Sequence, residues 1–79
     1  MKYTLIIKQV SLHHNFIQEI EEIEDITIVK VANYLKNREE LSNESINKLF
    51  ARVLEGESVG SIAIYINTFD YKIYILKLN

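Results

Sequence analysis

The clearest hydrophobic periodicity in the chain lies in residues 43–55. Apolar side chains recur there at intervals of three and four residues, which places them on one face of a helix. These side chains are Ile46, Leu49, Phe50, Val53 and Leu54. Ser42 is a suitable N-cap, and Gly56 stands where helices commonly end in a left-handed residue. The pattern predicts a helix whose apolar face packs against a core.

Residues 2–10 and the C-terminal segment have the composition of strands. Apolar and β-branched residues dominate both, and Asn67-Thr68-Phe69-Asp70 suits a turn between two strands. With that turn, Ile62 faces Ile75 and Ile64 faces Ile73, so one face of the hairpin is wholly apolar. The other face is mixed: it carries Ala63, Tyr65, Lys72, Tyr74 and Leu76. We expect the apolar face to point toward the core.

The segment between the first strand and the helix at 43–55 is predicted to contain two further helices. Asn15 and Gln18 have the spacing of a capping box, and the apolar residues that follow recur at helical intervals. These residues are Phe16, Ile17, Ile20 and Ile23. Residues 26–38 begin with a β-branched run that is typical of a strand. A helix with Asp25 as its N-cap is nevertheless favoured, because it places Ile28, Val31, Ala32 and Leu35 in one apolar stripe.

The predicted fold is α+β, with a three-stranded antiparallel sheet and helices packed on one of its faces. The elements follow the order β-α-α-α-β-β, or β-α-β-α-β-β with a fourth strand if residues 26–35 are extended. A length of 79 residues predicts a single compact domain over 1–79. The chain has no cysteine, no segment of about 20 apolar residues and no signal-peptide pattern, so we expect a soluble cytoplasmic protein.

No motif in the sequence indicates catalysis or a cofactor. His13 and His14 are adjacent and lack a ligating residue four positions on, so a metal site is not expected. The serines lie outside any nucleophile-elbow pattern, and Gly56 and Gly60 lack the spacing of a phosphate-binding loop. We therefore expect no enzymatic activity, no cofactor and no metal.

An acidic segment is the most distinctive feature of the composition. It comprises Glu19, Glu21, Glu22, Glu24 and Asp25. On a helix these carboxylates spread over an exposed arc, which is either a solvated face or a docking surface for a basic, nucleic-acid-binding host protein. The spacing alone does not separate the two interpretations.

The mixed face of the predicted hairpin is the second candidate surface. Tyrosine is enriched in interface cores, and Tyr65 and Tyr74 flank Lys72 on this face. A partner protein, another element of the same chain, or a second copy in a homodimer are the three candidate occupants. The predicted partner-binding residues are therefore Tyr65, Lys72 and Tyr74 together with the acidic segment.

Direct binding to nucleic acid is less expected. A strand, three helices and a hairpin resemble a winged helix, in which residues 43–55 would present Lys48 and Arg52 to DNA. Glu44 and Glu55 on the same side oppose this, and the formal net charge is −2. The sequence thus favours a small protein-binding module, with a DNA-binding regulator and a homo-oligomeric assembly protein as alternatives.

The chain combines small size, lack of catalytic motifs, alternating blocks of charge and a residue usage typical of AT-rich coding DNA. In this general character it is similar to many phage and mobile-element proteins that inhibit host defences, including the anti-CRISPR proteins. This similarity implies an inhibitor that acts by occupying a surface of a host protein.

Overall fold

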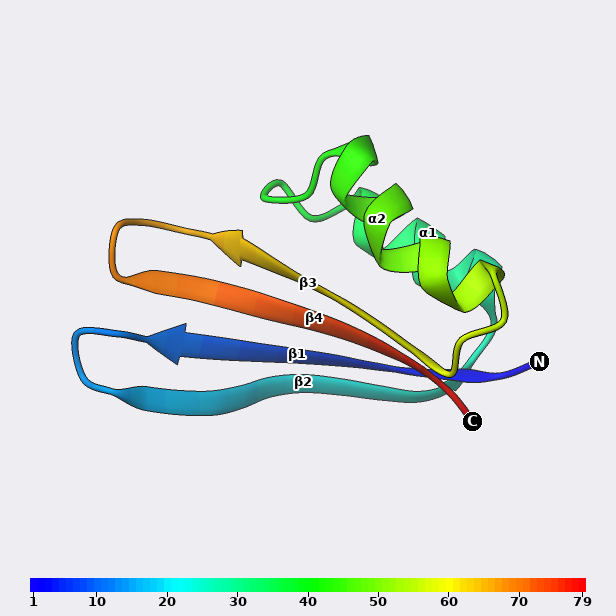
Figure 1. The fold of residues 1–79 in the computed structure, drawn as a ribbon, viewed down its shortest axis with the longest axis horizontal. Helices are drawn as coiled ribbons and strands as arrows, with labels where there is room; N and C mark the ends of the chain where they lie inside the picture. Colours follow the sequence, from blue (N-terminus) through cyan, green and yellow to red (C-terminus); the bar gives the residue numbers. More distant parts are fainter.

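Four antiparallel strands form one sheet, and two helices pack on one of its faces (Figure 1). The computed structural model covers residues 1–79. The elements are β1 (Tyr3–Ser11), β2 (Phe16–Ile26), α1 (Ile28–Lys36), α2 (Asn43–Leu54), β3 (Val59–Tyr65) and β4 (Asp70–Leu78). The strands lie in the order β2-β1-β4-β3, so two hairpins meet through their inner strands β1 and β4. The α+β class and the antiparallel sheet are confirmed, but the chain order β-β-α-α-β-β matches neither predicted order.

The main error of the sequence prediction concerns residues 16–26, which form the edge strand β2 and not a helix. Two bulges interrupt its pairing with β1. At one, Ile20 is an extra residue between Glu19 and Glu21, whose partners in β1 are consecutive. At the other, Asp25 adopts a left-handed φ of 56°. Asn15, with φ of 48°, belongs to the hairpin turn before β2 and caps no helix.

These bulges explain the helix-like spacing of the isoleucines in β2. Residues on one face of a regular strand recur every second position, and one inserted residue lengthens that interval to three. Ile20, Ile23 and Ile26 consequently all pack against the core while recurring at an interval of three. The same interval is expected for a helix face.

Both observed helices begin at side-chain caps. The helix favoured for residues 26–38 is confirmed as α1, although its N-cap is Thr27, whose hydroxyl accepts from the N–H of Lys30 at 3.4 Å. Asp25 does not cap it, because that residue is in the bulge of β2. For α2 the predicted caps are confirmed: Ser42 accepts from the N–H of Ser45 at 3.1 Å, and Gly56 has φ of 101°. Leu54, which was predicted to lie on the core-facing side of this helix, is 68% exposed. Neither helix has the length and apolar composition needed to cross a membrane.

The core lies between the helices and one end of the sheet. Its eleven buried residues come from β1, β4, both helices and the loop between them. They are Tyr3, Leu5, Ile7, Val31, Leu35, Leu41, Ile46, Leu49, Val53, Tyr74 and Leu76. The helices cover the part of the sheet remote from the two hairpin loops, so the looped end extends beyond them (Figure 1).

The C-terminal hairpin is shifted by one residue from the predicted register. Ile62 pairs with Tyr74 and Ile64 pairs with Lys72. The shift arises in the turn, where the N–H of Ile66 donates to the carbonyl of Asp70 at 2.8 Å. A shift of one residue turns every side chain of β4 to the opposite face, and this determines the position of Tyr74.

Candidate interaction surface

The face of the sheet opposite the helices, which we call the open face, has no covering layer (Figure 1). The pairing places its residues in rows across the strands. Read from β2 to β3, three of these rows are Ile17-Val10-Tyr71-Tyr65, Glu19-Lys8-Ile73-Ala63 and Glu22-Ile6-Ile75-Ser61. β4 contributes an apolar side chain to each of these rows, and the acidic side chains come only from β2. The centre of the open face is therefore apolar apart from Lys8 of β1, and carboxylates lie along one border.

Exposed apolar side chains gather where the two hairpin loops meet, which we call the tip end. The N–H of Leu12 donates to the carbonyl of Phe69 at 2.8 Å and ties the loops together. Six of the ten large hydrophobic residues that are exposed in the chain lie at this end. They are Leu12, Phe16, Ile17, Tyr65, Ile66 and Phe69. Tyr65 and Ile17 are 70% and 66% exposed and also end a row of the open face, so the two surfaces are continuous.

His13 and His14 lie at the tip end. Their ring centroids are 5.1 Å apart, and both line a shallow hollow of about 400 Å³ with residues of the other loop, including Asp70. Hydrogen bonds from Asn67 and Ser11, and then the nearby histidines, hold the pKa of the Asp70 carboxyl below its usual range. The structure brings together no group of three or more His, Cys, Asp or Glu side chains that could hold a metal ion.

The acidic segment lies along β2 and its bulge near α1, at one edge of the sheet. Glu21 turns toward the helices and pairs with Arg38, with 2.6 Å between Oε1 and Nη2. The other four carboxylates are exposed and have no ion-pair partner within 4.0 Å: Glu19, Glu22, Glu24 and Asp25. The carboxylates therefore lie along an edge of the sheet and do not form the exposed helical arc that was predicted. Glu21 does not contribute to this exposed edge, because it is paired with Arg38.

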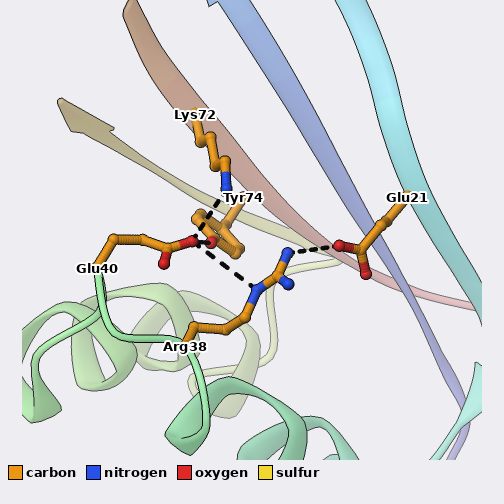
Figure 2. A network of polar contacts seen from close by, with 5 residues as sticks. All are labelled: Glu21, Arg38, Glu40, Lys72 and Tyr74. Atoms are coloured by element: carbon orange, nitrogen blue, oxygen red, sulfur yellow. Dashed lines mark hydrogen bonds and ion pairs between the residues drawn. The ribbon is translucent and has the colours of Figure 1, made fainter. Parts of the chain in front are cut away.

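Glu21 belongs to a polar network that fastens the loop between the helices to the sheet (Figure 2). Arg38 and Glu40 extend from that loop, and Lys72 and Tyr74 reach them from β4 (Figure 2). The Glu40 carboxylate accepts from Lys72 Nζ at 3.3 Å and from the Tyr74 hydroxyl. The Arg38 guanidinium lies 3.8 Å from the Glu40 carboxylate and 5.2 Å from the centre of the Tyr34 ring. The network joins β2, β4, α1 and the interhelical loop.

The ionisation of the network follows from its hydrogen bonds. Burial alone would raise the pKa of Glu40, but hydrogen bonds from Tyr74 and Lys72 outweigh it and hold that pKa below its usual range. Burial, together with the hydrogen bond to Glu40, raises the pKa of Tyr74 to about 12. Burial would lower the pKa of Arg38, and the hydrogen bond to Glu21 overcomes this and raises it. At neutral pH, the protonated Tyr74 hydroxyl therefore donates a hydrogen bond to an ionised Glu40.

The predicted grouping of Tyr65, Lys72 and Tyr74 on one face does not form. Tyr65 lies on the open face, whereas the shifted register turns Lys72 and Tyr74 toward the helix side. Tyr74 is completely buried, and Lys72 is half-buried beside Glu40. Tyr71 lies on the open face instead, with its ring 5.4 Å from that of Tyr65.

The structure also places the two cations that were considered for DNA contact. Lys48 and Arg52 lie on the exposed side of α2, and each lies 3.4 Å from a carboxylate, Glu44 and Glu57 respectively. The winged-helix order is not formed, because residues 16–26 form a strand and the chain has two helices. Comparison of the chain with protein-family models, with curated proteins and with solved structures finds no match.

Proposed function

We propose that the protein is a non-enzymatic binding module that acts by occupying a surface of another protein. The observation that supports this is the open face, where three isoleucines and Tyr71 of the central strands lie in rows without a covering layer. An antiparallel sheet with one face in water normally alternates apolar and polar residues, so that its outer face is polar. Extended apolar patches on a folded protein commonly mark interaction sites. The exposed side chains of the tip end enlarge this patch.

The border of the open face indicates the charge of the target. Four carboxylates along β2 are exposed and unpaired, and no basic side chain of the open face comes from β2 or β3. Complementary charge raises the rate of association and disfavours partners of the wrong sign. We propose a basic target surface, such as that of a nucleic-acid-binding host protein. The general character of the chain adds the proposal that it is a phage or mobile-element inhibitor of a host defence protein.

The apolar part of this proposal is tested with Ile73→Lys. Ile73 lies in the second row of the open face, so a lysine there should weaken target binding by about tenfold or more. The target is first captured with the tagged protein from the lysate of a low-GC bacterium, with nuclease treatment, and affinities are then measured with the purified target. Val29→Lys is the matched control, because Val29 is an exposed aliphatic residue of α1. Unchanged affinity of a folded Ile73→Lys chain, or capture of nuclease-sensitive material only, would contradict the proposal.

The electrostatic part is tested by reversing two unpaired charges of the border. Glu22→Lys with Glu24→Lys should slow association by about tenfold or more at low salt and leave dissociation nearly unchanged. Raising the ionic strength should narrow the difference from wild type, because exposed charges are screened. Glu44→Lys with Glu55→Lys is the matched control, because it makes the same change of net charge at exposed positions in the first turn and at the C-cap of α2. Equal association rates for the two double variants would refute a basic target at β2.

A further inference from the structure

The two edges of the sheet have opposite properties. β2 carries the acidic segment and two bulges, which are features that prevent pairing with another strand. β3 has the sequence VGSIAIY, without charge, proline or bulge, and it pairs with β4 in one continuous register. An uncharged, regular edge strand is a site at which another strand can add.

The outer backbone groups of β3 are free. The carbonyl of Ser58 accepts from the N–H of Leu78, and the N–H of Ile66 donates to the carbonyl of Asp70. Residues bonded to the neighbouring strand alternate in an antiparallel pair, so the residues between the bonded ones direct their N–H and C=O groups outward. These residues are Val59, Ser61, Ala63 and Tyr65. All four residues are exposed.

We propose that a second copy of the chain occupies this edge, through antiparallel pairing of β3 with β3 about a two-fold axis at Ile62. In this register Val59 faces the partner's Tyr65 and Ser61 faces the partner's Ala63. Every outward N–H and C=O group of β3 then has a partner in the other copy. A register displaced by two residues in either direction leaves some of these groups unpaired. The product is one continuous sheet built from both chains.

The uncharged sequence of β3 is what favours a second copy as the occupant. Two β3 strands bring no like charges together, and the residues that face each other near the axis, Ser61 and Ala63, are small. Antiparallel pairing of β2 with β2 about a two-fold axis would instead place the carboxylates of one copy beside those of the other. Association at β3 therefore closes at two copies and does not continue as a fibre. Near the tip end the helices do not cover β3, which leaves that part of the edge accessible (Figure 1).

The measurement is the mass in solution of the untagged chain, by sedimentation or light scattering from micromolar to millimolar concentration. We expect twice the mass of the chain at the upper concentrations. Ser61→Glu with Ala63→Glu, and separately Ser61→Lys with Ala63→Lys, should weaken dimerisation on the order of 100-fold, because like charges face each other. Ser61→Gln with Ala63→Gln is the control for side-chain size. An equimolar mixture of the Glu and Lys chains should restore a dimer containing one of each.

Three results would overturn the proposal. The first is a wild-type chain that stays monomeric at millimolar concentration. The second is a folded double-Glu chain that dimerises like wild type, since the copies would then meet at another surface. The third is a failure of the Glu and Lys chains to pair with each other. Target binding is measured separately with Ile73→Lys, so failure of the dimer and failure of the proposed function are distinguishable.

Discussion

Gly60→Ala is expected to lower the free energy of unfolding by about 3 kcal/mol, near the upper end of the range for overpacked sites. A Cβ atom at position 60 would lie 2.5 Å from the carbonyl oxygen of Leu49 and 3.3 Å from a methyl group of Val53. The first of these contacts is with the backbone of α2, which cannot turn away as a side chain would. The helix must therefore move outward and weaken the packing of Leu49 and Val53 in the core.

Denaturation by urea, followed by circular dichroism, measures the effect. Ser61→Ala is the matched control, because Ser61 is the next residue of β3 and lies exposed on the open face, where a change within about 0.5 kcal/mol is expected. A Gly60→Ala chain as stable as this control would show that α2 does not depend on close approach to β3.

The elements that could be predicted from the sequence are those in which a local pattern and a cap agree. In α2 the apolar stripe, Ser42 and Gly56 all specify the same boundaries, and the structure has them. In α1 the apolar stripe predicted the helix correctly despite the β-branched run, but the N-cap is Thr27 and not Asp25. The composition of the terminal strands was also sufficient to place β1 and the C-terminal hairpin.

β2 could not be predicted in this way, because its bulges imitate helical spacing. Ile20, Ile23 and Ile26 recur at intervals of three, and glutamates, which favour helices more than strands, fill three of the four positions between them. Only pairing with β1, which skips one residue at each bulge, shows that these isoleucines share a face. That information depends on a neighbouring strand and is not present in the segment itself.

The register of β4 was ambiguous for a different reason. Both faces of this strand are rich in large apolar residues, with Ile73 and Ile75 on one and Tyr74 and Leu76 on the other, so hydrophobicity cannot choose between them. The turn determines the register of β4. The Asn67 side chain accepts from the N–H groups of Phe69 and Asp70 and closes the loop one residue earlier than predicted. The acidic segment was recognised as a surface feature, whereas the polar network was missed because its members are distant in sequence.

The polar network gives a second large effect, which depends on pH. A tyrosine in the unfolded chain ionises near pH 10, whereas the pKa of Tyr74 in the folded protein is raised to about 12. Between these values the folded state retains a proton that the unfolded state has lost, so the free energy of unfolding falls as pH rises. The stabilisation is complete below about pH 10, and a difference of about two pKa units corresponds to a loss of about 2 to 3 kcal/mol by pH 12.

Tyr74→Phe isolates this contribution, because ionisation elsewhere in the chain is common to both proteins. At neutral pH the variant should be less stable than wild type by about 1 kcal/mol, since Glu40 loses a hydrogen-bond donor. The difference should shrink and then reverse as pH approaches 12, because phenylalanine has no proton to lose. Urea denaturation of both chains from neutral pH to about 12 measures this difference in the free energy of unfolding. In Glu40→Gln the free energy of unfolding should fall less steeply with rising pH than in wild type, because the Glu40 carboxylate contributes to the raised pKa of Tyr74. A constant stability difference between wild type and Tyr74→Phe over this range would show that the Tyr74 phenol is not protected by burial and Glu40, and that the interhelical loop is held to β4 by its ion pairs alone.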